Sequence, residues 1–166
     1  MDRLFYLTPS LCLAAAIWVL SQRYVAFTLM QLPGTLCHEL AHFVAGLLTF
    51  ARPVSLSIIP RREGKGYRLG EVKLANARWY NSAFTALAPL LLALIPWWVA
   101  VLRTRGTWHF EALDAGLAFL VAPQFLACWP SATDWKLAVR SWPLLLIAGA
   151  GWYAWTTIPW LHGLVA

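Results

Sequence analysis

The sequence predicts an all-α polytopic membrane protein with about five transmembrane helices and one short β-hairpin. Apolar residue types make up 60% of the 166 residues, and Asp, Glu, Lys and Arg only 12%, which is about half the charged share of a soluble domain. The apolar residues form long runs that can cross a hydrocarbon core. Many of the eleven Trp lie at the ends of these runs, where indole rings favour the headgroup boundary. The length fits a single domain, residues 1–166.

The apolar runs predict the helices and their interruptions. We expect helices at approximately 5–21, 24–50, 82–102, 115–135 and 142–163. The first run resembles a signal peptide, and we interpret it as a retained helix. Pro33 and Gly34 interrupt the second run, so a helix should kink or restart there. Pro123 and Pro130 predict irregular last turns in the fourth run.

The 51–81 loop is the only sizeable polar segment, and it predicts a β-hairpin. Residues 53–60 partly alternate between apolar and polar types, residues 67–74 resemble a second strand, and 62–66 have the composition of a turn. An exposed edge of this hairpin can pair with an extended peptide, which would make it a substrate-presenting element. The alternative is a hairpin that only connects two helices.

The distribution of positive charge predicts the orientation in the membrane. With five crossings, ten of the thirteen Lys and Arg residues fall on one side. This side holds Arg3, the 51–81 loop, Lys136 and Arg140, whereas the other holds Arg23, Arg103 and Arg105. Because positive residues accumulate on the cytoplasmic side, we expect the N-terminus and the loop in the cytoplasm and the C-terminus outside. The expected location is a bacterial or archaeal inner (plasma) membrane.

Charge and cysteine content exclude two other classes of partner or site. The net charge of +6 comes from basic residues between apolar runs, so it follows from membrane topology, and we expect no nucleic-acid partner. Cys12, Cys37 and Cys128 all lie within apolar runs and form no CxxC pair. Disulfides and a cysteine metal site are therefore not expected.

One motif in the second apolar run carries chemistry. Residues 38–42 read His-Glu-Leu-Ala-His, the HExxH pattern. On a helix the two histidines lie on one face and can hold one metal ion, and Glu39 lies close enough to take a proton from water on that metal. Ionisable groups inside a membrane are costly unless they serve a function. The sequence therefore predicts a zinc site with His38 and His42 as ligands and Glu39 as catalytic base.

A hydrolytic zinc site needs a third protein ligand. Ala45 and Leu48 occupy the positions that a metzincin would use, and Glu63 has the spacing of a gluzincin ligand but lies in the polar turn. Other acidic and histidine residues are expected on the far side of the membrane: His109, Glu111, Asp114 and His162. Asp134 is the remaining candidate, because it lies at the cytoplasmic end of a crossing. It reaches the histidines if their helix ends early, near Gly46, or if the chain folds back after Pro130.

The motif and the later Asp resemble the site-2 protease (M50) family of intramembrane zinc metalloproteases, of which this chain would be a small, divergent member. These enzymes have a helix before the motif helix, a β-rich loop after it, one further helix and then the Asp. The resemblance implies that His38, His42 and Asp134 ligate Zn²⁺ and that Glu39 activates water, with the site toward the cytoplasmic face.

The resemblance also implies the substrate, a transmembrane protein cut within or beside the lipid bilayer. The family's substrate-orienting Asn has no clear counterpart, and Asn76 and Asn81 are the candidates. Two alternatives stay open: a catalytically inactive relative that acts as a scaffold or binding subunit, and a small transporter in which His38 and His42 form a proton relay. Four histidines are too few for a di-iron hydroxylase.

Overall fold

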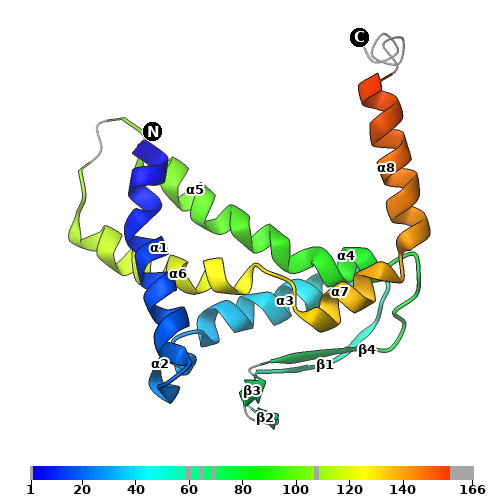
Figure 1. The fold of residues 1–166 in the computed structure, drawn as a ribbon, viewed down its shortest axis with the longest axis horizontal. Coiled ribbons are helices and arrows are strands. Elements are labelled where there is room, and N and C mark those ends of the chain that lie inside the picture. Colours follow the sequence, from blue (N-terminus) through cyan, green and yellow to red (C-terminus); the bar gives the residue numbers. More distant parts are fainter. Residues whose placement is uncertain (1, 59–60, 64–65, 69, 107–108, 158–166) are drawn as a thin grey trace.

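The computed structural model describes residues 2–58, 61–63, 66–68, 70–106 and 109–157. It is mostly helical, with small antiparallel two-stranded sheets. The elements in chain order are α1 (Asp2–Ser21), α2 (Val25–Leu29), α3 (Leu32–Leu48), β1 (Pro53–Ser57), β2 (Arg61–Glu63), β3 (Gly66–Arg68), β4 (Glu71–Leu74), α4 (Ser82–Leu87), η1 (Ala88–Ala93), α5 (Leu94–Arg103), α6 (Ala112–Ala127), α7 (Ala132–Val139) and α8 (Trp142–Thr157). Figure 1 shows their arrangement, with α8 standing apart from the other helices.

Two apolar clusters join α1 to the helices behind it. Tyr6 and Leu7 pack against Ala100 and Val121, and one further cluster joins α1 to α6 and the α2 segment. The residues in that second cluster are Ala14, Ile17 and Ala122, with Phe27 and Met30 against them. Small side chains at these contacts allow helices to approach closely, which favours helix association in lipid.

Two helical stretches are long and apolar enough to cross a membrane, Asp2–Ser21 and Ser82–Arg103. A third is added if α6 and α7, bent by 51° at the Cys128–Ser131 break, are one span. Two or three possible crossings are thus shown within the described residues, and the five that the sequence predicts are not shown. The expected helices at 5–21 and 82–102 are confirmed, and the end of the expected 142–163 helix lies outside the described residues.

The helices break near Pro33 and Pro130, as the sequence indicated, whereas α6 continues through Pro123 to Ala127. The 24–50 run forms α2 and α3 with a break at Met30–Gln31, and Pro33 stands in the first turn of α3, where the missing N–H costs no hydrogen bond. The 115–135 run ends its first helix at Ala127, and the chain turns at Pro130 before α7.

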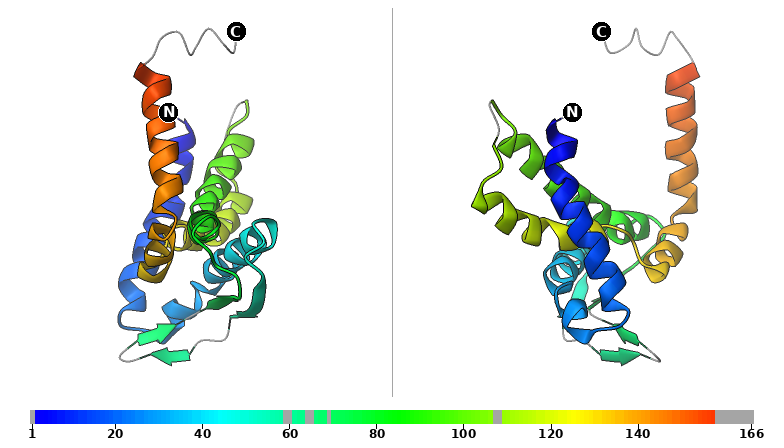
Figure 2. Two further views of the ribbon diagram at one scale, coloured as in Figure 1. Left: turned by 90° about the vertical axis from the view of Figure 1, so that its right-hand side faces the viewer. Right: turned by 60° about the vertical axis from the view of Figure 1, so that its left-hand side comes forward.

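The expected placement of the chain ends needs a correction. Arg3 stacks over the ring of Trp97 at 5.5 Å, and the Tyr6 hydroxyl donates a hydrogen bond to Asp114, which also pairs with Arg103. The N-terminal end of α1 thus lies with Arg103, not opposite it. Figure 1 and Figure 2 show this end and the end of α8 on one side, with the hairpin on the other. The sequence count had placed Arg3 and Arg103 on opposite sides, because it assumed that each of the five apolar runs crosses the membrane once.

The 51–81 loop forms the predicted hairpin in two sections. β1 pairs antiparallel with β4 through Ser55–Lys73, Leu56–Val72 and Ser57–Glu71, and β2 pairs with β3 further out. The single strand expected over 67–74 is divided, because β3 ends at Arg68 and β4 begins at Glu71. α3 contacts both β1 and β4, so the base of the hairpin lies against the motif helix.

Candidate metal centre

Helix α3 presents the two histidines of the motif toward α4, α6 and α7. His38 and His42 are one helical turn apart, and their side chains are 13% and 9% exposed. The close approach of α3 to α6 depends on Gly34, because a Cβ there would lie 2.4 Å from the carbonyl oxygen of Pro123. A larger residue would push the histidine face away from α6.

A backbone carbonyl orients each imidazole. His38 Nδ1 donates to the carbonyl of Ala127 at 2.6 Å, and His42 Nδ1 donates to that of Thr85 at 2.7 Å. A carbonyl oxygen only accepts, so each Nδ1 must carry the hydrogen, and in a neutral imidazole Nε2 is then a bare acceptor. Metal-ligating histidines almost always donate their other ring nitrogen in this way.

Proline explains why the Thr85 carbonyl is available. In a regular helix that carbonyl would accept from the N–H four residues later, but residue 89 is Pro, which has no N–H. Pro89 also stands in the first turn of η1, where the helix changes type. The missing hydrogen bond leaves the Thr85 oxygen for His42.

The carbonyl of Ala127 is available for a related reason. Ala127 is the last residue of α6, and the N–H that would continue the helix, that of Ser131, donates instead to Asp134 Oδ2 at 2.7 Å. The hydroxyl of Ser131 in turn accepts from the Asp134 N–H at 3.2 Å, which completes a capping box at the start of α7. One local motif thus frees the oxygen for His38 and fixes the Asp134 carboxylate.

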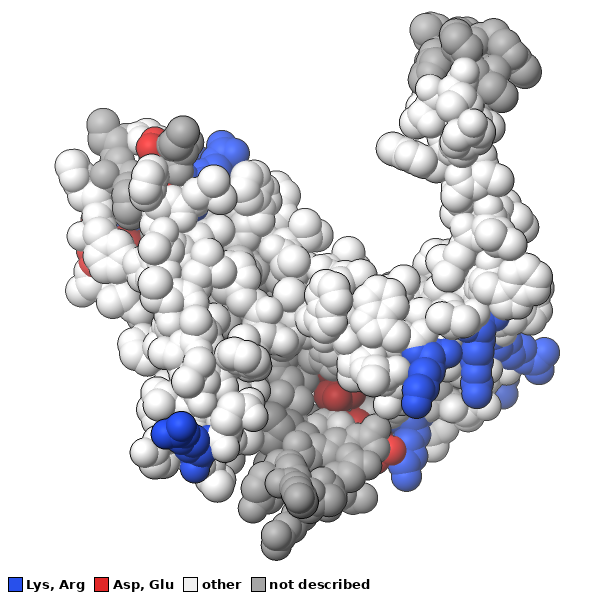
Figure 3. All heavy atoms as spheres, in the orientation of Figure 1, with Lys and Arg blue, Asp and Glu red and all other residues white. Residues whose placement is uncertain are grey.

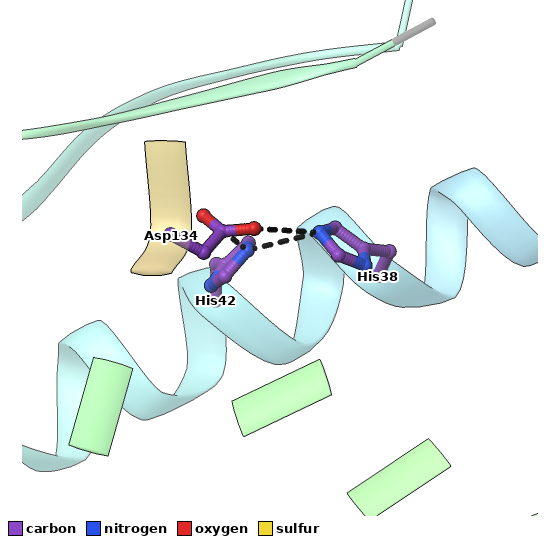
Figure 4. Close-up of side chains that lie close together, drawn as sticks. All are labelled: His38, His42 and Asp134. Carbon is purple, nitrogen blue, oxygen red and sulfur yellow. Dashed lines mark hydrogen bonds and ion pairs between the residues drawn. The ribbon is translucent and has the colours of Figure 1, made fainter. Parts of the chain in front are cut away.

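The three predicted ligands converge on one point, as Figure 4 shows. The two Nε2 atoms lie 3.1 Å apart, Asp134 Oδ1 lies 3.2 Å from His42 Nε2, and Asp134 Oδ2 lies 3.4 Å from His38 Nε2. The chain folds back after Pro130 to achieve this. α3 ends at Leu48, two residues after Gly46 and two before the expected end at residue 50.

The donor set fits a metal ion. Two imidazole nitrogens and one carboxylate form a possible metal-binding group, in which one ligand atom from each residue lies within 4.8 Å of the others. With Nε2 unprotonated, three electron-rich acceptors face one another, an arrangement that requires a cation or shared protons.

Glu39 faces the same cavity as the three ligands. The cavity has a volume of about 680 Å³ and lies between the hairpin and the α6–α7 turn. Its lining includes His38, Glu39, His42, Asp134 and Gly70. Glu39 is 9% exposed, and a Cβ on Gly70 would lie 2.5 Å from its Cγ and 2.7 Å from Oε1. The backbone at the start of β4 therefore lies directly against the Glu39 side chain.

The structure places the other sequence candidates elsewhere. His109 is exposed, and Glu111 and Asp114 pair with Arg103. The side chains of Glu63 and His162 lie outside the described residues. Asn81, buried at 1%, donates to the carbonyls of Thr49 and Asn76, so it holds the loop before α4 together. Neither it nor Asn76 is among the described residues that line the cavity.

Four residues of the site were not expected to be functional. Thr85 and Ala127 act through carbonyls, Ser131 through the capping box and Gly70 through its lack of a side chain. Ser131 could have been found, because Ser-x-x-Asp at a helix start is a capping pattern and Asp134 was already a candidate. Pro89 was a signal for Thr85, since a proline always frees the carbonyl four residues before it.

Comparisons with known proteins add no relative. No protein-family model matches the chain, and no curated protein and no solved structure is significantly similar to it. The site and the fold therefore carry the functional argument by themselves.

Proposed function

We propose that this protein is an intramembrane zinc metallopeptidase of the site-2 protease type. The observation that carries the proposal is the convergence of three side chains: His38 Nε2 and His42 Nε2 lie 3.1 Å apart, and each lies within 3.4 Å of one oxygen of the Asp134 carboxylate. Both histidines are oriented by carbonyls, and Glu39 faces the same cavity. Three metal ligands and a neighbouring carboxylate that can act as a base are the minimum set of residues for a zinc hydrolase.

Each residue has a defined role in this proposal. His38, His42 and Asp134 hold the metal, which when bound supplies the Lewis acidity that acidifies water and polarises a peptide carbonyl. Glu39 accepts one proton as the water oxygen bonds to the carbonyl carbon. It returns that proton to the amide nitrogen as the C–N bond breaks, which releases a carboxylic acid and an amine.

The lining of the cavity supports the proposal that the substrate binds in an extended conformation. It is lined on one side by Gly70, Glu71, Val72 and Leu74 of the β4 region and on the other by the α6–α7 turn, and no described residue of β1 lines it. β4 therefore presents the hairpin edge that faces the metal centre. A peptide segment that pairs with this edge would pass beside Glu39 in the extended form that exposes its carbonyls.

The charge distribution supports a cytoplasmic metal centre. With Arg3 moved to the end of Arg103 and Arg105, and with the α1–α2 connection that contains Arg23 at the hairpin end (Figure 1), the sequence still places ten basic residues at one end and three at the other. By the positive-inside rule the hairpin and the metal centre face the cytoplasm, whereas the N-terminal end of α1 faces outward.

A proton relay through the histidines is disfavoured by their hydrogen bonds. A relay needs each imidazole to take up a proton on one nitrogen and release one from the other. Here each Nδ1 hydrogen is held by a backbone carbonyl, which passes no proton onward. An inactive relative that binds metal as a scaffold would keep the same geometry, so only activity separates it from a peptidase.

The test combines metal analysis with cleavage by the purified full-length protein. We expect about one zinc per chain by mass spectrometry of the metal, and cleavage of fluorescent casein and of a detergent-solubilised single-span protein. Glu39→Gln should keep the zinc and lose about 10²–10⁴-fold in rate, because it removes the base and retains the ligands.

Other outcomes reject the proposal in distinguishable ways. Zinc without any cleavage by the wild type identifies an inactive relative. Absence of metal supports shared protons in the triad. Iron in place of zinc identifies an oxidative centre, since two histidines and one carboxylate also form iron sites.

A further inference from the structure

Basic and aromatic side chains gather where α4 meets α7. Residues 78–80, Arg-Trp-Tyr, precede α4, and residues 136–142 run from α7 into α8. The two segments are joined by the Ala83 N–H, which donates to the Ser141 hydroxyl at 2.8 Å. We define the α4–α7 patch as Arg78, Trp79, Tyr80, Lys136, Arg140 and Trp142. Figure 3 shows Lys and Arg gathered below α8, on the side of the hairpin.

The position of the patch along the helices corresponds to the headgroup layer of a bilayer. It lies at the start of two apolar helical stretches, Ser82–Arg103 and α8. No described residue of α8 is buried, so lipid acyl chains are the medium that can solvate it. Trp79, Tyr80 and Trp142 are 53%, 42% and 60% exposed, and exposed indole and phenol rings at helix ends favour the bilayer interface.

The positive charge of the patch is not neutralised by the described part of the protein. Arg78 Nε donates to the neutral amide of Asn76 at 2.7 Å. Lys136 and Arg140 are exposed, and the Lys and Arg ion pairs within the described residues all involve Arg103, at the other end. An anionic partner would thus meet cations that have no competing carboxylate.

The partner is not a peptide in the catalytic cavity, because no described residue lining that cavity is Lys or Arg. Charge, aromatic rings and depth together fit a lipid surface. We propose that the α4–α7 patch binds the headgroups of anionic phospholipids. Asp134 and Lys136 lie on the same short helix, α7, so lipid bound at the patch fixes the depth of the metal centre. The proposal does not depend on peptidase activity.

The experiment counts lipids retained by the purified full-length protein. The protein is placed in mixed micelles with equal amounts of phosphatidylglycerol and phosphatidylcholine of the same acyl chains, and bound lipids are counted by native mass spectrometry. The test variant is Lys136→Gln with Arg140→Gln. The matched control is Arg3→Gln with Arg105→Gln, which removes two exposed charges at the opposite end.

We expect the wild type and the control variant to retain more phosphatidylglycerol than phosphatidylcholine. The test variant should lose about thirty-fold of this preference, about five-fold for each charge removed. If the double variant does not fold, the single variants Lys136→Gln and Arg140→Gln are measured instead. Each should show an intermediate loss of the preference for phosphatidylglycerol. Equal retention of both lipids by the wild type, or equal losses in the test and control variants, would overturn the proposal.

Discussion

The two ends of the molecule each hold a cluster of charged side chains from distant helices, but they differ in how the charge is balanced. At the α5–α6 end, Asp114 accepts from Arg103 Nε at 2.8 Å, from the Tyr6 hydroxyl at 3.0 Å and from the Glu111 N–H at 2.8 Å. The Asp114 carboxylate is therefore already paired with a cation, the Arg103 guanidinium. This cluster is structural, because its members satisfy one another.

At the hairpin end, Asp134 faces two imidazoles and no Lys or Arg ion pair within the described residues. Its other contacts are the N–H and hydroxyl of Ser131. The carboxylate is held in place without a permanent positive charge beside it. The comparison teaches that a carboxylate fixed by a capping box but without a neighbouring cation indicates a candidate metal site. A carboxylate paired with Arg indicates a structural ion pair.

The largest expected effect comes from removing the third ligand. Asp134→Ala should lower the zinc content from about one per chain to near zero and abolish cleavage, because two histidines alone leave the coordination incomplete. The control is Ser131→Ala, which disrupts the same capping box, costs about 1 kcal/mol of stability, and should still bind zinc. Equal metal loss in both variants would show that Asp134 acts through the cap.

The next effect concerns the contact between the hairpin and Glu39. Gly70→Ala should displace the Glu39 side chain and slow cleavage by about 10- to 100-fold, since small misplacements of a catalytic group are costly. Zinc content should not change, because the three atoms nearest to a Cβ at Gly70 all belong to Glu39 and not to a predicted ligand. The measurement is the cleavage rate with zinc content. Gly116→Ala serves as control because its Cβ would have open space.

The orienting carbonyl of His42 gives a smaller expected effect. Pro89→Ala supplies an N–H that competes with His42 for the Thr85 carbonyl, so zinc affinity should weaken by about ten-fold, as for other residues that orient metal ligands. Competition with a zinc chelator measures this affinity. Pro96→Ala, in the same helical stretch, should leave the affinity unchanged. An unaltered affinity for both variants would mean that the Thr85 contact does not orient the ligand.

The smallest effect on the metal is expected at the opposite cluster. Asp114→Asn should leave zinc content unchanged but lower the melting temperature by roughly 5 °C, because Arg103 and Tyr6 lose a charged partner. Thermal unfolding of the purified protein in detergent provides the measurement. A loss of zinc in this variant would show that the two ends are coupled. The Asp114–Arg103 cluster could then no longer be called purely structural.

The sequence predicted the chemical groups of the site better than their supports. The HExxH spacing placed two imidazoles on one face, because helical periodicity is a local property. Asp134 was predicted from its place near a helix end and from resemblance. The orienting carbonyls of Thr85 and Ala127 belong to segments distant from the motif, and their positions depend on how α4 and α6 pack on α3.

The fold was predicted less completely than the site. Apolar runs identified the helices and prolines identified the breaks, since both depend on local residue types. The number of crossings was not determined, because hydrophobicity does not report helix direction. α3 is as apolar as a spanning helix but runs obliquely between other helices.

The separation of the ligands along the chain has a consequence for biosynthesis. His38 and His42 leave the ribosome on α3, whereas Asp134 follows only after the hairpin and α4 to α6 have been made. Until then the nascent chain offers only a pair of imidazoles, and a site of nitrogen ligands generally binds Cu²⁺ more tightly than Zn²⁺. Under the proposed function, the carboxylate that completes the zinc site is therefore added last, when α7 docks onto α4.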